Sequence, residues 1–390
     1  MKTAYNETDL YNLHVIKESK SWMKHTFISA EQFQKIGEAF KSPLYHPNLI
    51  IRVLLFIATL FALSGVTGLF TLFIVSIDES ERFISIACIF YGIASFVFLE
   101  KLFIGQNRHY KSGVNEALIY HACGFTIGGL LGVSDFNEHL GFLGCLIVLS
   151  FAAIRYLDLL CTIAATLTFA GFIFYEFYNI GGIFQQTIPF VFILFFTPLY
   201  FFIRKLKKQE PLKFWHQNLF IIESLSLLFI YAAGNYLVVR ELSAELMNLY
   251  LEEGSDVPFA FIFYGLTVLI PITYLYFGIK TKNIVLLRVS LIVLAFSVFT
   301  FKYYFSLGHP EITLTVAGLA LLAISIALTN YLKIVRNGFT RENLLTEKWS
   351  NMNAEAFIIS QTMGGNQVTA KEQFKGGGGG FGGGGASGDF

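Results

Sequence analysis

Long apolar runs fill the middle of the chain, and most are separated by short segments that contain charged residues, proline or glycine. A helix needs roughly 20 apolar residues to cross the hydrocarbon core of a bilayer. The runs predict membrane spans at 49–77, 81–104, 113–134, 139–154, 156–175, 184–204, 216–239, 258–279, 283–305 and 310–332. The pattern therefore predicts an all-α fold, a polytopic transmembrane helix bundle of about ten spans over residues 49–332.

The region 139–175 holds two of these runs, and its middle is marked only by Arg155 and Asp158. A single helix of this length would be about 55 Å long, more than a bilayer needs even when a helix tilts. Two spans also leave the basic residues of 204–208 on the same side as most other lysines and arginines, which the positive-inside rule favours. We therefore predict a tight turn near Arg155 and both chain ends in the cytoplasm.

Residues 1–48 are polar and lysine-bearing, and they predict short cytoplasmic amphipathic helices. Ser29 and Gln32 form a capping-box pattern that opens one such helix, and Pro43 ends it. These helices are expected either to pack under the bundle or to lie at the lipid headgroups. The first long apolar run begins at Leu49, so it is expected to act as an internal, uncleaved signal anchor.

The C-terminal region changes character twice after the last predicted span. Residues 333–363 predict a cytoplasmic amphipathic segment, and 364–390 predict a disordered glycine-rich tail, because ordering glycine costs the most backbone entropy. Phe374, Phe381 and Phe390 are spaced along this tail. Two interpretations stay open: a tail without a role, or a docking or sorting element whose terminal carboxylate a protein partner captures.

The composition agrees with a chain whose main partner is the lipid bilayer. Hydrophobic residues make up 54% of the sequence and charged residues 14%, whereas soluble domains carry about 25% charged residues. The net charge of +1 creates no field that would attract nucleic acid. We therefore predict a membrane protein that does not bind nucleic acid.

The residue types that carry catalysis or bind metals show no recognisable pattern. Cys88, Cys123, Cys145 and Cys161 each lie inside an apolar run, without zinc-ligand spacing, and are predicted to be packing residues. The sequence contains no phosphate-binding loop, nucleophile elbow or metalloprotease motif. It therefore predicts no metal, no cofactor and no catalytic residue, and an enzyme is the weakest interpretation.

Two parts of the chain resemble known families. Trp22, the sequence ISAEQ at 28–32, and the step from Pro47 into a first span with Gly65 and Gly68 resemble the DUF2157-type bacterial membrane proteins. The glycine-rich tail resembles the tails of bacterial membrane proteins that carry a TPM domain, although this chain has no such domain. The resemblance implies a bacterial cytoplasmic-membrane protein and no particular activity.

The third predicted span is richest in candidate functional residues. Glu116 and His121 are ionisable groups inside it, and Gly124, Gly128 and Gly132 recur every four residues. One interpretation is a tight helix-packing surface of the GxxxG type, with Glu116 near the cytoplasmic headgroups. The other is a proton or ion path. Glu116 and His121 lie roughly 140° apart around the helix, so such a path needs partners from other spans.

Glu223 and Arg288 lie at similar depths in the seventh and ninth predicted spans. By depth alone, both side chains are about 8–12 Å from the cytoplasmic boundary, and an ion pair between them is geometrically possible. If paired, they would serve packing; unpaired, Glu223 would be a candidate proton carrier.

The sequence supports two hypotheses about function. The first is a non-enzymatic integral membrane scaffold or partner-binding subunit that engages a protein partner through its termini or tail. The second is a secondary transporter with an intramembrane proton or ion path that uses Glu116, Glu223 and Arg288. Ten spans permit two inverted repeats of five, but 49–175 and 184–332 show no similarity, which counts against a transporter.

Overall fold

The computed structural model describes residues 2–246, residues 256–304 and scattered positions between 315 and 333. Every regular element in these residues is a helix. Most of the tenth predicted span and of the segment 333–363 lies outside the described residues. The tail, with Phe374, Phe381 and Phe390, also lies outside them.

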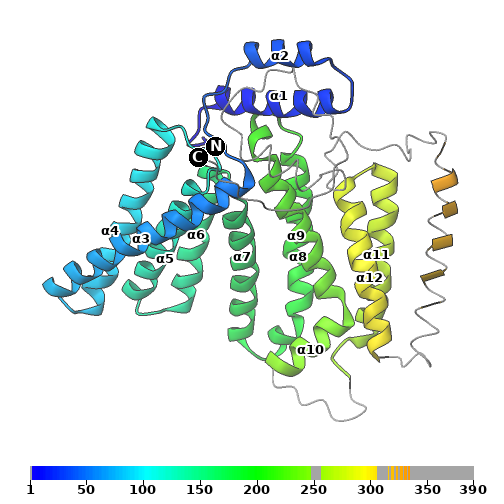
Figure 1. The fold of residues 1–390 in the computed structure, drawn as a ribbon. Coiled ribbons are helices and arrows are strands. Elements are labelled where there is room, and N and C mark those ends of the chain that lie inside the picture. Colours follow the sequence, from blue (N-terminus) through cyan, green and yellow to red (C-terminus); the bar gives the residue numbers. More distant parts are fainter. Residues whose placement is uncertain are drawn as a thin grey trace, which may run out of the picture.

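Within the described residues, nine helices are long and apolar enough to cross a membrane. They are α3 (Leu49–Ile77), α4 (Glu81–Phe98) with its π-helical continuation η1 (Leu99–Gln106), α5 (Val114–Val133), α6 (Glu138–Tyr156), α7 (Leu159–Ile180), α8 (Ile183–Leu206), the 3₁₀ helix η2 (Glu210–Trp215) with α9 (His216–Gly234), α11 (Ala260–Thr281) and α12 (Ile284–Tyr304). Each corresponds to one of the first nine predicted spans, which confirms a helical, multi-pass architecture (Figure 1).

The region 139–175 forms two helices, as predicted. Leu157 adopts a left-handed conformation with φ 56° and ends α6. Asp158 then caps α7, because its carboxylate accepts a hydrogen bond from the backbone N–H of Cys161 at 2.8 Å. One left-handed residue and one cap are enough to reverse the chain without proline or glycine.

The seventh predicted span, 216–239, is too long at its C-terminal end. α9 ends at Gly234, and Asn235 has an extended backbone with ψ 124°. The Asn235 side chain accepts from the backbone N–H of Val238 at 3.2 Å, and α10 (Tyr236–Leu246) begins at once. The predicted span extended to 239 because Leu237 and Val238 are apolar. In the structure these two residues belong to α10 and not to the span.

The two ends of the bundle differ (Figure 1). One end carries α1 (Glu7–Lys24) and α2 (Ala30–Ala39) and is called the α1 face here; the opposite end carries α10. α1 and α2 form a hairpin in which the Asn12 amide donates to the Lys41 carbonyl at 2.8 Å. The capping box of Ser29 and Gln32 is present as predicted.

The start of the N-terminal region packs on the bundle, as in the first of its two predicted placements. Tyr5 and Leu10 are buried in one apolar cluster with Leu99 and Trp215. The backbone N–H of Ala4 donates to the carbonyl of Arg155 at 2.8 Å. The first residues are therefore part of the folded core at the α1 face.

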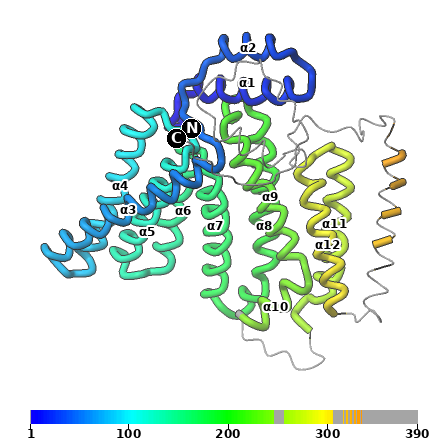
Figure 2. The backbone as a smooth tube through the Cα atoms, viewed as in Figure 1, coloured from blue at the N-terminus to red at the C-terminus, as the bar shows by residue number. Residues whose placement is uncertain are grey.

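In the view of Figures 1 and 2, the helix α3 runs at a steep angle to the other membrane-length helices (Figure 2). Its 29 residues include none that is buried. At 1.5 Å per residue it is about 44 Å long, so a tilt fits it into a hydrocarbon core of about 30 Å. Since none of its residues is buried, its attachment at the α1 face contributes to its position.

The glycine surface predicted on α5 is partly wrong. A Cβ added at Gly124 or Gly128 would meet nothing within 4 Å, whereas one at Gly129 or Gly132 would collide with α4. On α4, a Cβ at Gly92 would approach the Thr126 side chain to 2.2 Å. α4 therefore packs along the row of α5 residues spaced three apart, and not along the row spaced four apart.

Candidate functional site

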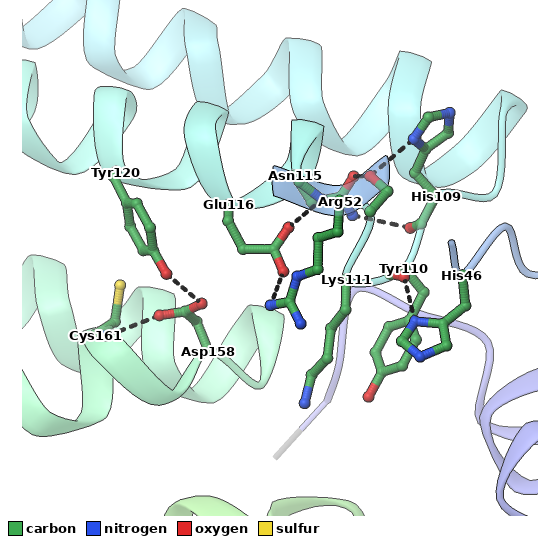
Figure 3. A network of polar contacts seen from close by, with 12 residues as sticks. His46, Arg52, His109, Tyr110, Lys111, Asn115, Glu116, Tyr120, Asp158 and Cys161 are labelled. Atoms are coloured by element: carbon green, nitrogen blue, oxygen red, sulfur yellow. Dashed lines mark hydrogen bonds and ion pairs between the residues drawn. The ribbon is translucent and has the colours of Figure 1, made fainter. Parts of the chain in front are cut away.

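Polar side chains gather at the α1 face between α3, α5, α7 and the loop 107–113, and we call them the polar network (Figure 3). The labelled members are His46, Arg52, His109, Tyr110, Lys111, Asn115, Glu116, Tyr120, Asp158 and Cys161. They come from segments far apart in the sequence.

Glu116 lies in the first turn of α5 and joins that helix to α3. Its carboxylate forms an ion pair with the Arg52 guanidinium, and its other oxygen accepts from the backbone N–H of Gly113 at 2.8 Å. Gly113 has φ 92°, and a Cβ there would lie 2.0 Å from the Arg52 carbonyl oxygen. Glycine at this position thus lets the α5 entry approach the α3 backbone closely. Glu116 accepts from the otherwise unpaired N–H of Gly113 and balances the charge of Arg52.

Asp158 joins α5 to α7. The Tyr120 hydroxyl donates to one of its carboxylate oxygens at 3.1 Å, and the other caps α7. The buried Asn218 amide donates to the Asp158 carbonyl at 3.0 Å and to the Thr162 hydroxyl at 2.6 Å. The α7 N-terminus and the tyrosine therefore stabilise this buried carboxylate.

The loop 107–113 is held by side chains on both sides. The buried Asn115 amide donates to the carbonyl of His109 at 2.9 Å and to the Tyr5 hydroxyl at 3.3 Å. Arg108 and Lys111 have φ of 52° and 48°, a region that costs non-glycine residues about 1 kcal/mol or more. Burial raises the pKa of Tyr5 far above its usual range, so this hydroxyl stays neutral.

A second ion pair lies where η1 meets the turn between α6 and α7. The Arg155 guanidinium makes two hydrogen bonds of 2.8 Å to the Glu100 carboxylate, and it also donates to the Thr3 carbonyl at 3.1 Å. The Tyr156 hydroxyl donates to Glu100 at 3.1 Å. Neither Glu100 nor Arg52 is among the candidate residues predicted from the sequence. The signal was available, because each is a charged residue near the end of a predicted span.

The structure corrects the predicted Glu223–Arg288 pair. Glu223, 1% exposed, binds the Lys207 ammonium at 2.6 Å, and Asn283 donates to its other oxygen at 3.3 Å. Arg288 is exposed on α12. Equal depth did not bring the two together, because Lys207, at the end of α8, lies against α9 and reaches the carboxylate first.

His121 belongs to a third group of contacts. Its Nε2 lies 3.1 Å from the Tyr91 hydroxyl and 3.5 Å from the Thr67 hydroxyl, between α3, α4 and α5. The contacts of the described residues thus place Glu116, His121 and Glu223 in three separate clusters.

In chemical terms, the polar network combines compensated ion pairs with hydrogen-bonded helix ends, an arrangement suited to fixing helices relative to one another. Among the described residues, no group of three histidine, cysteine, aspartate or glutamate side chains is placed to hold a metal ion. Compared with family models, curated proteins and solved structures, the chain matches none of them.

Proposed function

We propose that this protein is a non-enzymatic membrane scaffold or partner-binding subunit of the bacterial cytoplasmic membrane, with its α1 face in the cytoplasm. The orientation follows from charge. Of the lysines and arginines in residues 2–246 and 256–304, Arg82, Arg240 and Lys302 lie toward the α10 end and the rest toward the α1 face. The positive-inside rule assigns such a face to the cytoplasm.

The observation that carries the proposal is the pairing of the carboxylates near the α1 ends of the spans. Glu100, Glu116 and Glu223 each bind a basic side chain. A carboxylate paired with a cation is a poor proton carrier. Protonating the carboxylate would leave the basic side chain without a counterion. The pairs instead tie helices together, which suits a rigid support.

The surface offered to a partner is α2, the outer helix of the hairpin that α1 and α2 form. α2 is the outermost element at this end (Figure 1) and has no buried residue. Its Glu31, Gln34, Lys35 and Glu38 side chains are exposed. With the predicted docking tail at 364–390, it would give a cytoplasmic partner two points of attachment.

The test is co-purification of the full chain from its native membrane in mild detergent. Deleting 364–390, or replacing the exposed α2 residues Glu31, Lys35 and Glu38 by serine, is expected to remove a specific set of partners. Serine replacement of the exposed α1 residues Glu18 and Lys20 is the matched control. An unchanged set of partners in both variants contradicts the proposal.

A second pair of variants separates a scaffold from a transporter. Glu116→Gln and Glu223→Gln are each introduced into protein reconstituted in vesicles, and proton flux is measured. We expect no flux above that of empty vesicles in the wild-type protein. Flux that either substitution abolishes, in a variant that still folds, establishes the transporter instead.

A further inference from the structure

We propose that Lys17, Arg52 and Lys111 form a binding site for the phosphate group of an anionic lipid headgroup. The three side chains come from α1, from the first turn of α3 and from the loop 107–113. Figure 3 shows the long side chains of Arg52 and Lys111 extending side by side away from α5. The site is distinct from the partner-binding surface of α2.

Lys111 is the centre of the site because its charge has no direct counterion. In residues 2–246 and 256–304, no carboxylate lies within ion-pair distance of its ammonium group, whose described contacts are Gln217 Oε1 at 3.3 Å and the Tyr110 ring at 5.6 Å. Burial, and then the charge of Arg52, lower the pKa of Lys111, and the more distant carboxylates of Asp158 and Glu116 oppose this only in part. A bound phosphate would offset both effects.

Arg52 retains donors for a second anion. Its ion pair with Glu116 uses Nη2, and within the described residues Nε and Nη1 make no hydrogen bond. Its side chain is 36% exposed. Guanidinium groups suit phosphate because their fixed donors match its oxygens.

His46 lies close enough to Lys17, Arg52 and Lys111 for the charge of each to act on its ring. The His46 ring lies beside Tyr110, with Nδ1 3.1 Å from that carbonyl oxygen. Burial, and then the charges of Lys17, Arg52 and Lys111, lower the pKa of His46. The carboxylates nearby are already engaged, Glu116 with Arg52 and Asp158 with Tyr120 and the α7 N-terminus.

The position of the site suits a lipid headgroup. Arg52 lies one turn into α3, and Lys111 stands three residues before α5, so both are where spans enter the interface. Basic side chains at this level bind anionic headgroups, each contributing about fivefold in affinity. The left-handed Lys111 backbone, with φ 48°, is a strained conformation of the kind that clusters at ligand sites.

The experiment measures phosphatidylglycerol binding to the full chain in uncharged detergent, by native mass spectrometry and by the midpoint of thermal unfolding. Phosphatidylglycerol is expected to bind and to raise the midpoint, and Lys111→Gln is expected to weaken binding about five- to tenfold. Lys111→Arg should restore it. Lys205→Gln removes an exposed positive charge at the same face, outside the proposed site, and should bind as the wild-type protein does.

Three outcomes overturn the proposal. The first is unchanged affinity in Lys111→Gln, or an equal loss in Lys205→Gln. The second is equal binding of phosphatidylcholine. The third is that glycerol phosphate binds as strongly as phosphatidylglycerol and raises the unfolding midpoint by as much. That result would assign the site to a soluble phosphate. If Lys111→Gln does not fold, Lys17→Gln on the exposed surface of α1 takes its place, with an expected loss of about fivefold.

Discussion

Three carboxylates at the α1 face, Glu100, Glu116 and Glu223, each bind a basic side chain from another element. Near a low-dielectric membrane interior, a charge without a partner is costly, and a pair is stable only with good geometry and further hydrogen bonds. All three meet this condition, because a backbone N–H, a tyrosine hydroxyl or an asparagine amide completes each carboxylate. At the scale of single residues, these charged side chains therefore join one helix to another.

Glu223→Gln should destabilise the protein, and Arg288→Gln should not. The first change leaves the Lys207 ammonium, whose side chain is 16% exposed, without its counterion. We expect a loss of about 3 kcal/mol in the free energy of unfolding. Arg288 is exposed, so its replacement should change that free energy by less than about 0.5 kcal/mol. Unfolding by denaturant in mild detergent measures both, and an equal loss in both variants would restore the Glu223–Arg288 pair.

Among the elements, α3 depends most on its contact at the α1 face. It has no buried residue along its length, yet its first turn meets Gly113 and Glu116 of the α5 entry. The chain before α3 also pairs with the loop 107–113, where the Tyr110 N–H donates to the Tyr45 carbonyl at 3.0 Å. The first turn of this peripheral span is thus fixed at the α1 face.

Gly113→Ala is expected to weaken this attachment. The new Cβ would lie 2.0 Å from the Arg52 carbonyl oxygen, and alanine disfavours φ 92°. The free energy of unfolding should fall by about 2 kcal/mol or more. Gly128→Ala is the control, since its Cβ would meet nothing within 4 Å. Protease cleavage after α3 and denaturant unfolding report the effect, and equal stability of the two variants would show that α3 does not need this approach.

For the whole molecule, the asymmetry between the two ends is the main feature. The α1 face has a packed cap of two helices, three ion pairs and most of the basic residues. The opposite end has short turns and α10, where Asp256 accepts from the Tyr236 and Tyr264 hydroxyls at 2.6 and 2.9 Å. The two ends of the described bundle therefore differ in packing and in charge.

The proposed orientation predicts which residues a membrane-impermeant thiol reagent reaches in intact cells. Thr26→Cys, between α1 and α2, should react only after the cells are opened. Asp135→Cys, in the exposed turn between α5 and α6, should react in intact cells. Wild-type protein controls for its own cysteines. The reverse pattern would invert the topology and place the α1 face outside.

The sequence alone determined the class of fold and most of its boundaries. Apolar runs of bilayer length have one stable solution, because backbone groups in lipid must be paired inside each helix. The turn near Arg155 was predictable from length and charge, and the Ser29 cap from a local pattern that needs no tertiary information. The scaffold hypothesis, the docking tail and the resemblance to DUF2157-type proteins stay predictions.

Only the tertiary structure decided which polar residues meet. Glu223 pairs with Lys207 and not with Arg288, and α4 packs on Gly129 and not on Gly128. The position of a residue in a span predicts its depth in the membrane and the face of its helix. Its partner depends on how the neighbouring helices are rotated about their axes. That rotation is set by packing over whole interfaces. The same reason explains why Lys111, an ordinary basic residue in the sequence, lies beside Arg52 without a direct counterion among the described residues.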